Sequence, residues 1–420
     1  MHATALLRSP KIWIFTLFGA LLAIVLTVGY LGGALDTDTP TQRIPIAWAD
    51  TDQGDGAQHL GATLTEEILT GGAHESAHWL PVTDEAQARE LLTTGTAYAA
   101  VVIPADFSAR VDALTDPQAQ PDAVRVTVLT NPIAGPAASG TANGIAQAVL
   151  ARLSRELGAR LASAHAADPA APTGLLAAGG LAADPIRVTL TPVGPVPAHS
   201  AGGMAAFYYT LVLILTGFLL AQLLHSGVDG VLGFTPREFL HKRATHPPLP
   251  INRVHTLLAK TGLMAGCAAV AGTVIEAVAV LAFGMPAEHP LGLWGLSMLA
   301  VATAGVLPLV LLAVFGAPGA LVATIVLVVF GVPSSGGAYP PELQPEVFRW
   351  LGQILPMRHT TDAARDLIFP VTGDAVIGSV LVIALWLVAS LSAGLLVTAF
   401  YDRTGRHRVS VYERTQADRA

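Results

Sequence analysis

Six runs of apolar residues divide the chain unevenly. Each is long enough, or nearly so, to cross a bilayer, whose hydrocarbon core of about 30 Å needs about 20 helical residues. One run lies near the N-terminus, a polar stretch of domain size follows, and five runs crowd the C-terminal half. The pattern predicts a mainly α-helical membrane protein with six transmembrane helices and one globular domain between the first and the second. The predicted spans are residues 12–31, 205–224, 257–283, 293–315, 320–332 and 376–400.

The first and fifth runs need individual interpretation. Trp13 and Tyr30 frame the first run and suit the two membrane interfaces. Residues 32–34 weakly match a signal-peptide cleavage site, but the run exceeds the usual apolar core of about 7–15 residues, so a retained anchor is predicted. Residues 316–319 (Gly-Ala-Pro-Gly) predict a turn. The short fifth run is expected to borrow length from that turn or to sit in a locally thinned bilayer.

Basic residues set the predicted orientation. With an even number of spans, three basic groups fall on one side, which is then the cytoplasmic side of a plasma membrane. The predicted parts are 1–33 (cytoplasmic N-terminus and first span), 34–203 (extracytoplasmic domain), 204–401 (five-helix domain with cytoplasmic loop 225–253 and outer re-entrant segment 333–372) and 402–420 (cytoplasmic tail). The orienting residues are Arg8 and Lys11; Arg237, Lys242, Arg243, Arg253 and Lys260; and Arg403, Arg406 and Arg408.

The polar stretch alternates strands and helices, which is typical of a small α/β domain. Thr83 or Asp84 is the expected cap of its second helix. Residues 163–200 are rich in Ala, Pro and Gly and predict mostly linker and turns. The expected strands are 44–49, 98–103, 123–129 and 186–190, and the expected helices are 57–69, 84–92 and 137–161.

Composition supports the membrane class. The chain is 52% hydrophobic and 13% charged, with a mean hydropathy of +0.55, whereas a soluble domain carries about 25% charged residues. A formal charge of −7 without a dense basic stripe gives no sign of a nucleic-acid partner. Cys267, the only cysteine, lies in an apolar run, so the polar domain has no disulfide. The acidic balance of that domain indicates a solvated surface rather than a cation site.

Two features invite a chemical interpretation. Glu276 lies inside the third run, where a carboxylate at mid-bilayer costs about 2.5–3.5 kcal/mol. It is expected to face protein or a water-filled cavity, as a proton relay, a contact on a substrate path, or a hydrogen bond between helices or subunits. His74, Glu75 and His78 match the zinc-protease pattern His-Glu-x-x-His. Because no third ligand is evident and the flanking glycines and proline leave about two turns without an apolar face, no metal site is predicted.

No Gly-x-x-x-x-Gly-Lys-Ser/Thr loop occurs in the chain. The chain is therefore not expected to be an enzyme or to hold a cofactor, and ATP would act through a separate ATPase subunit. The expected contact with that subunit is the loop 225–253, where Pro236 suits a helix start. The alternative is a solvated basic loop that only fixes topology. The candidate coupling residues are Arg237, Glu238, Phe239 and Leu240.

Residues 340–370 are too polar to span a membrane, and prolines break them into short pieces. Apolar residues recur at helical spacing over 347–354, which predicts a short helix that dips into the outer interface. This helix is either a lid that gates the exit of an apolar substrate or a packing element that closes the bundle. The candidate gate residues are Phe348, Trp350, Leu351, Arg358, Asp362 and Arg365.

Several motifs resemble those of known membrane proteins. Residues 47–54 (Ala-Trp-Ala-Asp-Thr-Asp-Gln-Gly), followed by 60–61, resemble the opening strand and loop of the outer domain in phage-infection-protein-like (YhgE/Pip) membrane proteins. Residues 84–86 with 95–108 are the sharpest match, and 207–209 (Phe-Tyr-Tyr) resemble the entry to the second span of that family. The stretches 333–340 and 355–365 resemble the re-entrant segment of type-2 ABC exporter permeases.

This resemblance implies six spans per subunit, both termini inside, a homodimer in membrane lipid, a separate ATPase subunit, and export of lipids, polysaccharides, drugs or peptides. The favoured function is the permease subunit of a type-2 ABC-like exporter that moves an amphiphilic, lipid-like or drug-like solute outward. One alternative is a non-transporting or ATP-independent surface protein, such as a phage attachment site, a secretion accessory or a scaffold. A membrane-anchored metalloprotease is the third interpretation.

Overall fold

The computed structural model describes residues 43–54, 60–70, 77–114, 123–167, 184–235, 237–239, 242–244, 251–370 and 375–405, together with the isolated positions 24, 27, 247 and 249. Two compact units divide the chain. One comprises Asp38–Met204, against a predicted domain of 34–203, and the other holds Ala205–Pro370 and the helix that follows. The predicted first span, 12–31, lies outside the described residues except for two positions.

The first unit is an α/β domain built on a five-stranded sheet in the order β2-β1-β3-β4-β5. β1 pairs in parallel with β2 and β3, whereas β4 runs antiparallel to β3 and parallel to β5. β1 and β3 are buried along most of their length, which explains their nearly continuous apolar sequences. The strands are β1 (Pro45–Asp50), β2 (His78–Val82), β3 (Ala99–Ile103), β4 (Val124–Thr130) and β5 (Ile186–Pro192).

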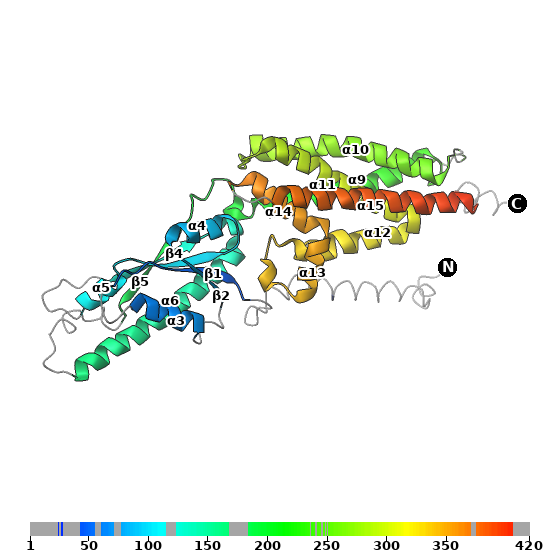
Figure 1. Ribbon diagram of the computed structural model, residues 1–420. Helices are drawn as coiled ribbons and strands as arrows, with labels where there is room; N and C mark the ends of the chain where they lie inside the picture. The colour runs from blue at the N-terminus through cyan, green and yellow to red at the C-terminus, as the bar shows by residue number, and fades with distance from the viewer. Residues whose placement is uncertain are drawn as a thin grey trace. The chain divides into compact units, whose positions relative to one another are not determined.

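Helices cover both faces of this sheet (Figure 1). On one face, Ala88 and Leu92 of α4 (Glu85–Thr93) pack against the alanines of β1 and β3. The other face carries α3 (Leu60–Thr70), α5 (Phe107–Ala113) and α6 (Pro136–Ala167). Asp84 is the cap of α4, because its side chain accepts a hydrogen bond of 2.8 Å from the backbone N–H of Gln87.

One carboxylate holds the start of two of these helices. Asp52 follows β1, and its Oδ1 accepts a hydrogen bond from the backbone N–H of Ser108 at 3.0 Å, at the start of α5. Its Oδ2 accepts from the backbone N–H of Gly61 at 3.2 Å, at the start of α3, and from the Ser108 hydroxyl. Asp52 thus satisfies N–H groups that helix termini leave without partners, which gives the Asp-Thr-Asp motif a structural role.

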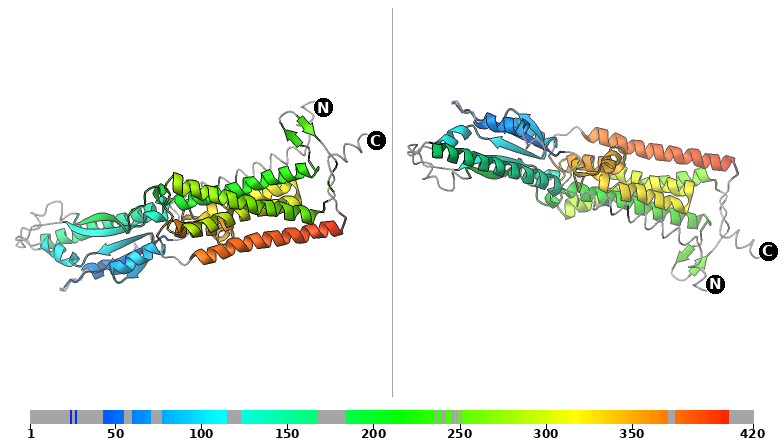
Figure 2. Two further views of the ribbon diagram at one scale, coloured as in Figure 1. Left: turned by 90° about the horizontal axis from the view of Figure 1, so that it is seen from above. Right: turned by 90° about the horizontal axis from the view of Figure 1, so that it is seen from below.

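The second unit is a helical bundle. Among the described residues, four helices are long and apolar enough to cross a membrane, and they correspond to the second, third, fourth and sixth predicted spans. Figure 2 shows the long helices running side by side. They are α9 (Ala205–Val231), α10 (Arg253–Ala277) continued by the π-helical η4 (Val278–Ala282), α11 (Pro290–Phe315), and α15 (Ala375–Arg403).

The fifth predicted span is a shorter helix that runs from Ala317 to Phe330. The four-residue turn predicted at 316–319 is wrong, because only Gly316, with φ 68°, leaves the helical conformation. α12 (Ala317–Thr324) begins at the next residue and continues into the π-helical η5 (Ile325–Phe330). Pro318 lies in the first turn, where its missing N–H costs nothing. The helix does borrow length from the predicted turn, but it measures only about 21 Å.

α11 is the central helix of the bundle and is largely buried, whereas α9, α10 and α15 leave most of their apolar surface exposed. Such exposed surface on several adjacent helices is what a lipid environment requires. At the close approach of α9 and α11, a side chain at Gly217 would meet the Val301 carbonyl oxygen at 2.5 Å. Nearby, the Tyr209 hydroxyl and the Ser297 Oγ lie 2.6 Å apart.

Candidate functional site

The segment predicted to re-enter the membrane contains two helices joined by a sharp bend. α13 (Glu346–Ile354) matches the predicted short helix, and α14 (Pro356–Ile368) follows directly. The expected break into short pieces is therefore wrong for α14, which is 13 residues long and buries one face in the bundle. Its polar sequence concealed it, because one of its faces carries charges that pair with one another. Two 3-10 turns precede the helices, η6 (Pro333–Ser335) and η7 (Pro341–Leu343).

The candidate gate residues on α13 lie on different sides of the helix. Phe348 is 4% exposed and packs against Phe330, with ring centroids 6.5 Å apart. Trp350 is 59% exposed, and Leu351 is half-buried. The α15 residue Trp386 donates a hydrogen bond of 2.7 Å from its Nε1 to the last carbonyl of α13. Phe348 is thus an interior packing residue, while Trp350 faces outward and can contact lipid.

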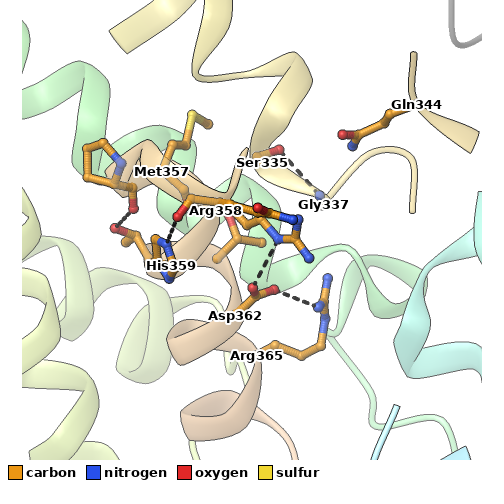
Figure 3. Close-up of polar contacts among 12 residues, drawn as sticks. Ser335, Gly337, Gln344, Met357, Arg358, His359, Asp362 and Arg365 are labelled. Atoms are coloured by element: carbon orange, nitrogen blue, oxygen red, sulfur yellow. Dashed lines mark hydrogen bonds and ion pairs between the residues drawn. The ribbon is translucent and has the colours of Figure 1, made fainter. Parts of the chain in front are cut away.

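The candidate gate residues on α14 form an ion-pair cluster. Figure 3 shows Asp362 between two guanidinium groups, with its Oδ2 3.6 Å from Arg358 Nε and its Oδ1 3.3 Å from Arg365 Nη1. All three side chains are about one quarter to one third exposed. Asp366, one helical turn after Asp362, adds a second carboxyl group beside Arg365, so the cluster combines two arginines with two acids on α14.

Two glycines let the re-entrant segment pack tightly. A Cβ on Gly337 would lie 2.4 Å from the ring of Phe207 at the start of α9, and one on Gly352 would lie 2.6 Å from the Ser334 carbonyl oxygen. Side chains at these positions would push η6 and α13 away from their neighbours. Both positions lie in or beside the motifs 333–340 and 355–365, whose conformation they support.

The opposite end of the bundle, where α9 and α15 end and α10 begins, holds a buried polar cluster that the sequence analysis missed. Lys260 Nζ lies 2.6 Å from Asp229 Oδ1 and 3.1 Å from His225 Nδ1, and His225 Nε2 lies 3.3 Å from Asp229 Oδ2. The side chains of Lys260 and Asp229 are only 3% and 1% exposed. A lysine inside an apolar run was the signal, because such a charge needs a partner.

The start of α10 is tied to the end of α15 at the same end. Asp402 accepts hydrogen bonds of 3.1 Å from the backbone N–H groups of Arg253 and Val254. The guanidinium of Arg253 lies 5.1 Å from the ring centroid of Tyr401, within range of a cation–π contact. A small pocket opens here, lined by His225, Arg253, Thr256, Leu257, Lys260 and Ala313.

The candidate coupling residues lie in a different conformation from the one predicted. Residues Arg237–Phe239 form strand β6, which pairs antiparallel with β7 (Lys242–Ala244). The helix start predicted at Pro236 is therefore wrong. Leu240 lies outside the described residues. The short hairpin keeps Arg237, Glu238 and Phe239 together in the connection between α9 and α10, but it presents them on a strand.

Glu276 lies closer to one end of its helix than a mid-bilayer position requires. The apolar helix runs from Arg253 to Ala282, so Glu276 is about 13 Å from the helix midpoint. The residue is 9% exposed, and its Oε2 is buried without a hydrogen-bond partner among the described residues. A bilayer centred on that midpoint would have the carboxyl group near the edge of its hydrocarbon core of about 30 Å. The carboxyl group lies at the end of the bundle that carries α13 and α14.

The histidines of the zinc-protease pattern do not share a described helix. His78 is exposed and begins strand β2, while His74 and Glu75 lie outside the described residues. Because the pattern requires both histidines on one face of a helix, the metalloprotease interpretation loses its geometric basis at His78.

A comparison with known families identifies the bundle. The family model described as "ABC-2 family transporter protein" matches residues 10–396. No curated protein and no solved structure matches the chain.

Proposed function

The chain belongs to the ABC-2 family of transporter membrane proteins, and from that premise we propose that it is the permease subunit of a type-2 ABC exporter. The observation that carries this proposal is the family match over residues 10–396. The family usually works with an ATPase partner, and the chain has no phosphate-binding loop. In this proposal the subunit is not an enzyme itself and holds no cofactor; ATP acts through a separate subunit, and two copies of the chain form the membrane path.

The proposed solute is an amphiphilic, lipid-like or drug-like molecule that moves outward. Three exposed apolar helix surfaces on α9, α10 and α15 support a path that is open to lipid. The re-entrant helices α13 and α14 would then stand at the exit, where the charged face of α14 meets a polar head group. As a finer proposal, residues 95–108, which form β3 and the start of α5, favour the phage-infection-protein-like (YhgE/Pip) branch of the family.

The proposed orientation places both termini and the β6–β7 hairpin in the cytoplasm and the α/β domain outside the cell. A Cys267→Ser background allows single cysteines to test it, because Cys267 is the only native cysteine. A cysteine in place of the exposed Gln87 on α4 should react with an impermeant maleimide on intact cells. One in place of His241 should react only after permeabilisation. Labelling of position 241 on intact cells would refute this orientation.

ATP-dependent uptake into inside-out membrane vesicles tests the transport proposal. Vesicles that contain the protein and its native partners are given a panel of fluorescent amphiphiles with cationic, neutral and anionic head groups. At least one should accumulate only with hydrolysable ATP, and accumulation should fall in the Arg237→Ala and Phe239→Ala double variant. If no amphiphile accumulates to a higher level than in vesicles that lack the protein, the favoured function becomes that of an ATP-independent surface protein. The outer α/β domain would also suit that function.

A further inference from the structure

Glu276 is a buried acid without a described partner. It is nine-tenths buried, and its Oε2 has no hydrogen-bond partner among the residues that the structure describes. A buried carboxyl group in this state is costly and needs an explanation. It also lies two residues before the π-helical end of its helix, Val278–Ala282, and such π-helical turns are frequent at functional sites.

No membrane span of this chain can supply a cation to Glu276. Within the six predicted spans, the only basic residue is Lys260. Asp229 already holds that lysine at 2.6 Å, and Lys260 lies about 24 Å from Glu276 along the helix. Because a second copy has the same sequence, its spans offer no other basic residue. The arginines of the re-entrant helices at the same end of the bundle pair instead with Glu346 or Asp362. A cationic group from another molecule can therefore serve as the counterpart of this carboxylate.

The polar neighbours of Glu276 restrict the chemistry of that group. Ser297 donates its hydroxyl hydrogen to the Leu293 carbonyl at 2.7 Å, so across the 2.6 Å contact Tyr209 must donate to Ser297. The Tyr209 oxygen keeps a lone pair for accepting a hydrogen bond, and the Ser297 backbone lies against Gly272, one helical turn before Glu276. With Glu276 in its carboxylate form, these three residues offer acceptors and no spare donor, which suits a positively charged donor.

We propose that this Glu276 site binds the ammonium group of a cationic amphiphile. The inference rests on the proposed export function and names its substrate class. Glu276 lies about 13 Å from the helix midpoint, near the depth at which an amphiphile has its head group. Ala269 is exposed and lies seven residues before Glu276, on the same face of the helix and nearer its midpoint, so an alkyl chain could extend past it into the bilayer core. An anionic head group would be repelled by the carboxylate.

Equilibrium binding to the full-length protein in phosphatidylcholine nanodiscs tests this site. The probes are radiolabelled dodecylamine and dodecanol, which share one alkyl chain, and empty nanodiscs give the partition background. The wild type should bind dodecylamine saturably and at least tenfold more tightly than dodecanol. Glu276→Gln should weaken amine binding at least tenfold and leave the alcohol unchanged, whereas Glu276→Asp should keep part of the preference. The matched control is Glu288→Gln, which removes an exposed carboxylate from the loop between the same two helices.

Two results would overturn the inference: equal binding of amine and alcohol to the wild type, or unchanged amine binding in a Glu276→Gln protein that still elutes as a folded species. Binding in nanodiscs needs no ATPase, so a failure of ATP-driven transport would contradict the proposed function and leave the amine site standing. If ATP-driven transport is observed but the Glu276→Gln change leaves amine binding unaltered, only the amine site is overturned.

Discussion

The buried pair between Lys260 and Asp229 gives a quantitative test of how the bundle is held together. Removing one partner leaves a charge with 1–3% exposure beside groups arranged for its opposite. Breaking a buried ion pair in this way costs about 3–5 kcal/mol, whereas replacing both partners by apolar residues of similar size is often nearly neutral. We therefore expect Asp229→Leu with Lys260→Met to be more stable than Asp229→Leu alone.

His225 makes the two single variants unequal. Without Lys260, the Asp229 carboxylate still has the imidazole Nε2 at 3.3 Å, and a protonated imidazole can neutralise it. Without Asp229, the imidazole Nδ1 at 3.1 Å from Lys260 can accept a hydrogen bond but cannot neutralise the ammonium. Asp229→Leu should therefore cost more stability than Lys260→Met.

A double-mutant cycle on reversible unfolding in mixed micelles measures both expectations. The coupling free energy between the two positions should be at least about 2 kcal/mol, since residues in contact couple by about 0.5–3 kcal/mol. Single-variant costs that add to the double-variant cost within about 0.5 kcal/mol would refute the pairing. A larger cost for Lys260→Met than for Asp229→Leu would refute the role given to His225.

Three further predictions concern packing, capping and charge. Gly272→Ala should destabilise the bundle by about 1–3 kcal/mol, because its Cβ would lie 2.9 Å from the backbone N of Met298 on α11; the unfolding midpoint measures this. Asp52→Ala should cost about 2–4 kcal/mol and speed proteolysis of the α/β unit, because two helix starts lose their acceptor. Glu67→Gln should raise the unfolding midpoint at neutral pH. The pKa of the Glu67 carboxyl is raised by its hydrogen bond to the Glu156 side chain and by partial burial, so the stability that the protonated form contributes is lost as pH rises through that raised pKa.

Each of these has a result that would contradict it. Gly266 is exposed and its Cβ would meet nothing within 4 Å, so Gly266→Ala should be harmless, and equal effects at the two glycines would argue against a close helix contact at Gly272. Unchanged proteolysis in Asp52→Ala would remove the shared-cap explanation. For Glu67→Gln, an increase in the unfolding midpoint that stays the same at pH values below 4.5, the ordinary glutamate pKa, would show that protonation of Glu67 is not its cause.

Long apolar runs were the part of the fold that the sequence revealed best, because length and polarity alone decide whether a helix can cross a membrane. Four of the five strands of the α/β unit were also predicted closely, since β1 and β3, for example, are buried on both faces and have apolar sequences. The strand β2 was not among the expected strands. Short or locally determined elements were harder. α5 has only seven residues, and the strand β6 follows a proline that suits a helix start equally well. α14 was hidden by charges that are satisfied within one helix face.

The candidate sites were predicted unevenly for a similar reason. Glu276 could be found because a single acid in an apolar run is conspicuous. The partnership of Lys260 with Asp229 and His225 joins residues 31–35 positions apart in the chain, and hydropathy carries no information about such pairs. The gate residues on α13 were chosen because apolar residues recur there at helical spacing. Phe348 and Trp350 nevertheless face different sides of the helix, and the contact of Phe348 with Phe330 shows which side is buried.

The central claim is that this chain is a permease that depends on a separate ATPase. The most direct measurement is purification of the tagged protein from its native membranes in mild detergent, followed by quantitative mass spectrometry of what accompanies it. We expect an ATPase subunit in stoichiometric amount, which is lost when Arg237 and Phe239 are both replaced by Ala. A homo-oligomer free of any ATPase across several detergents would contradict it.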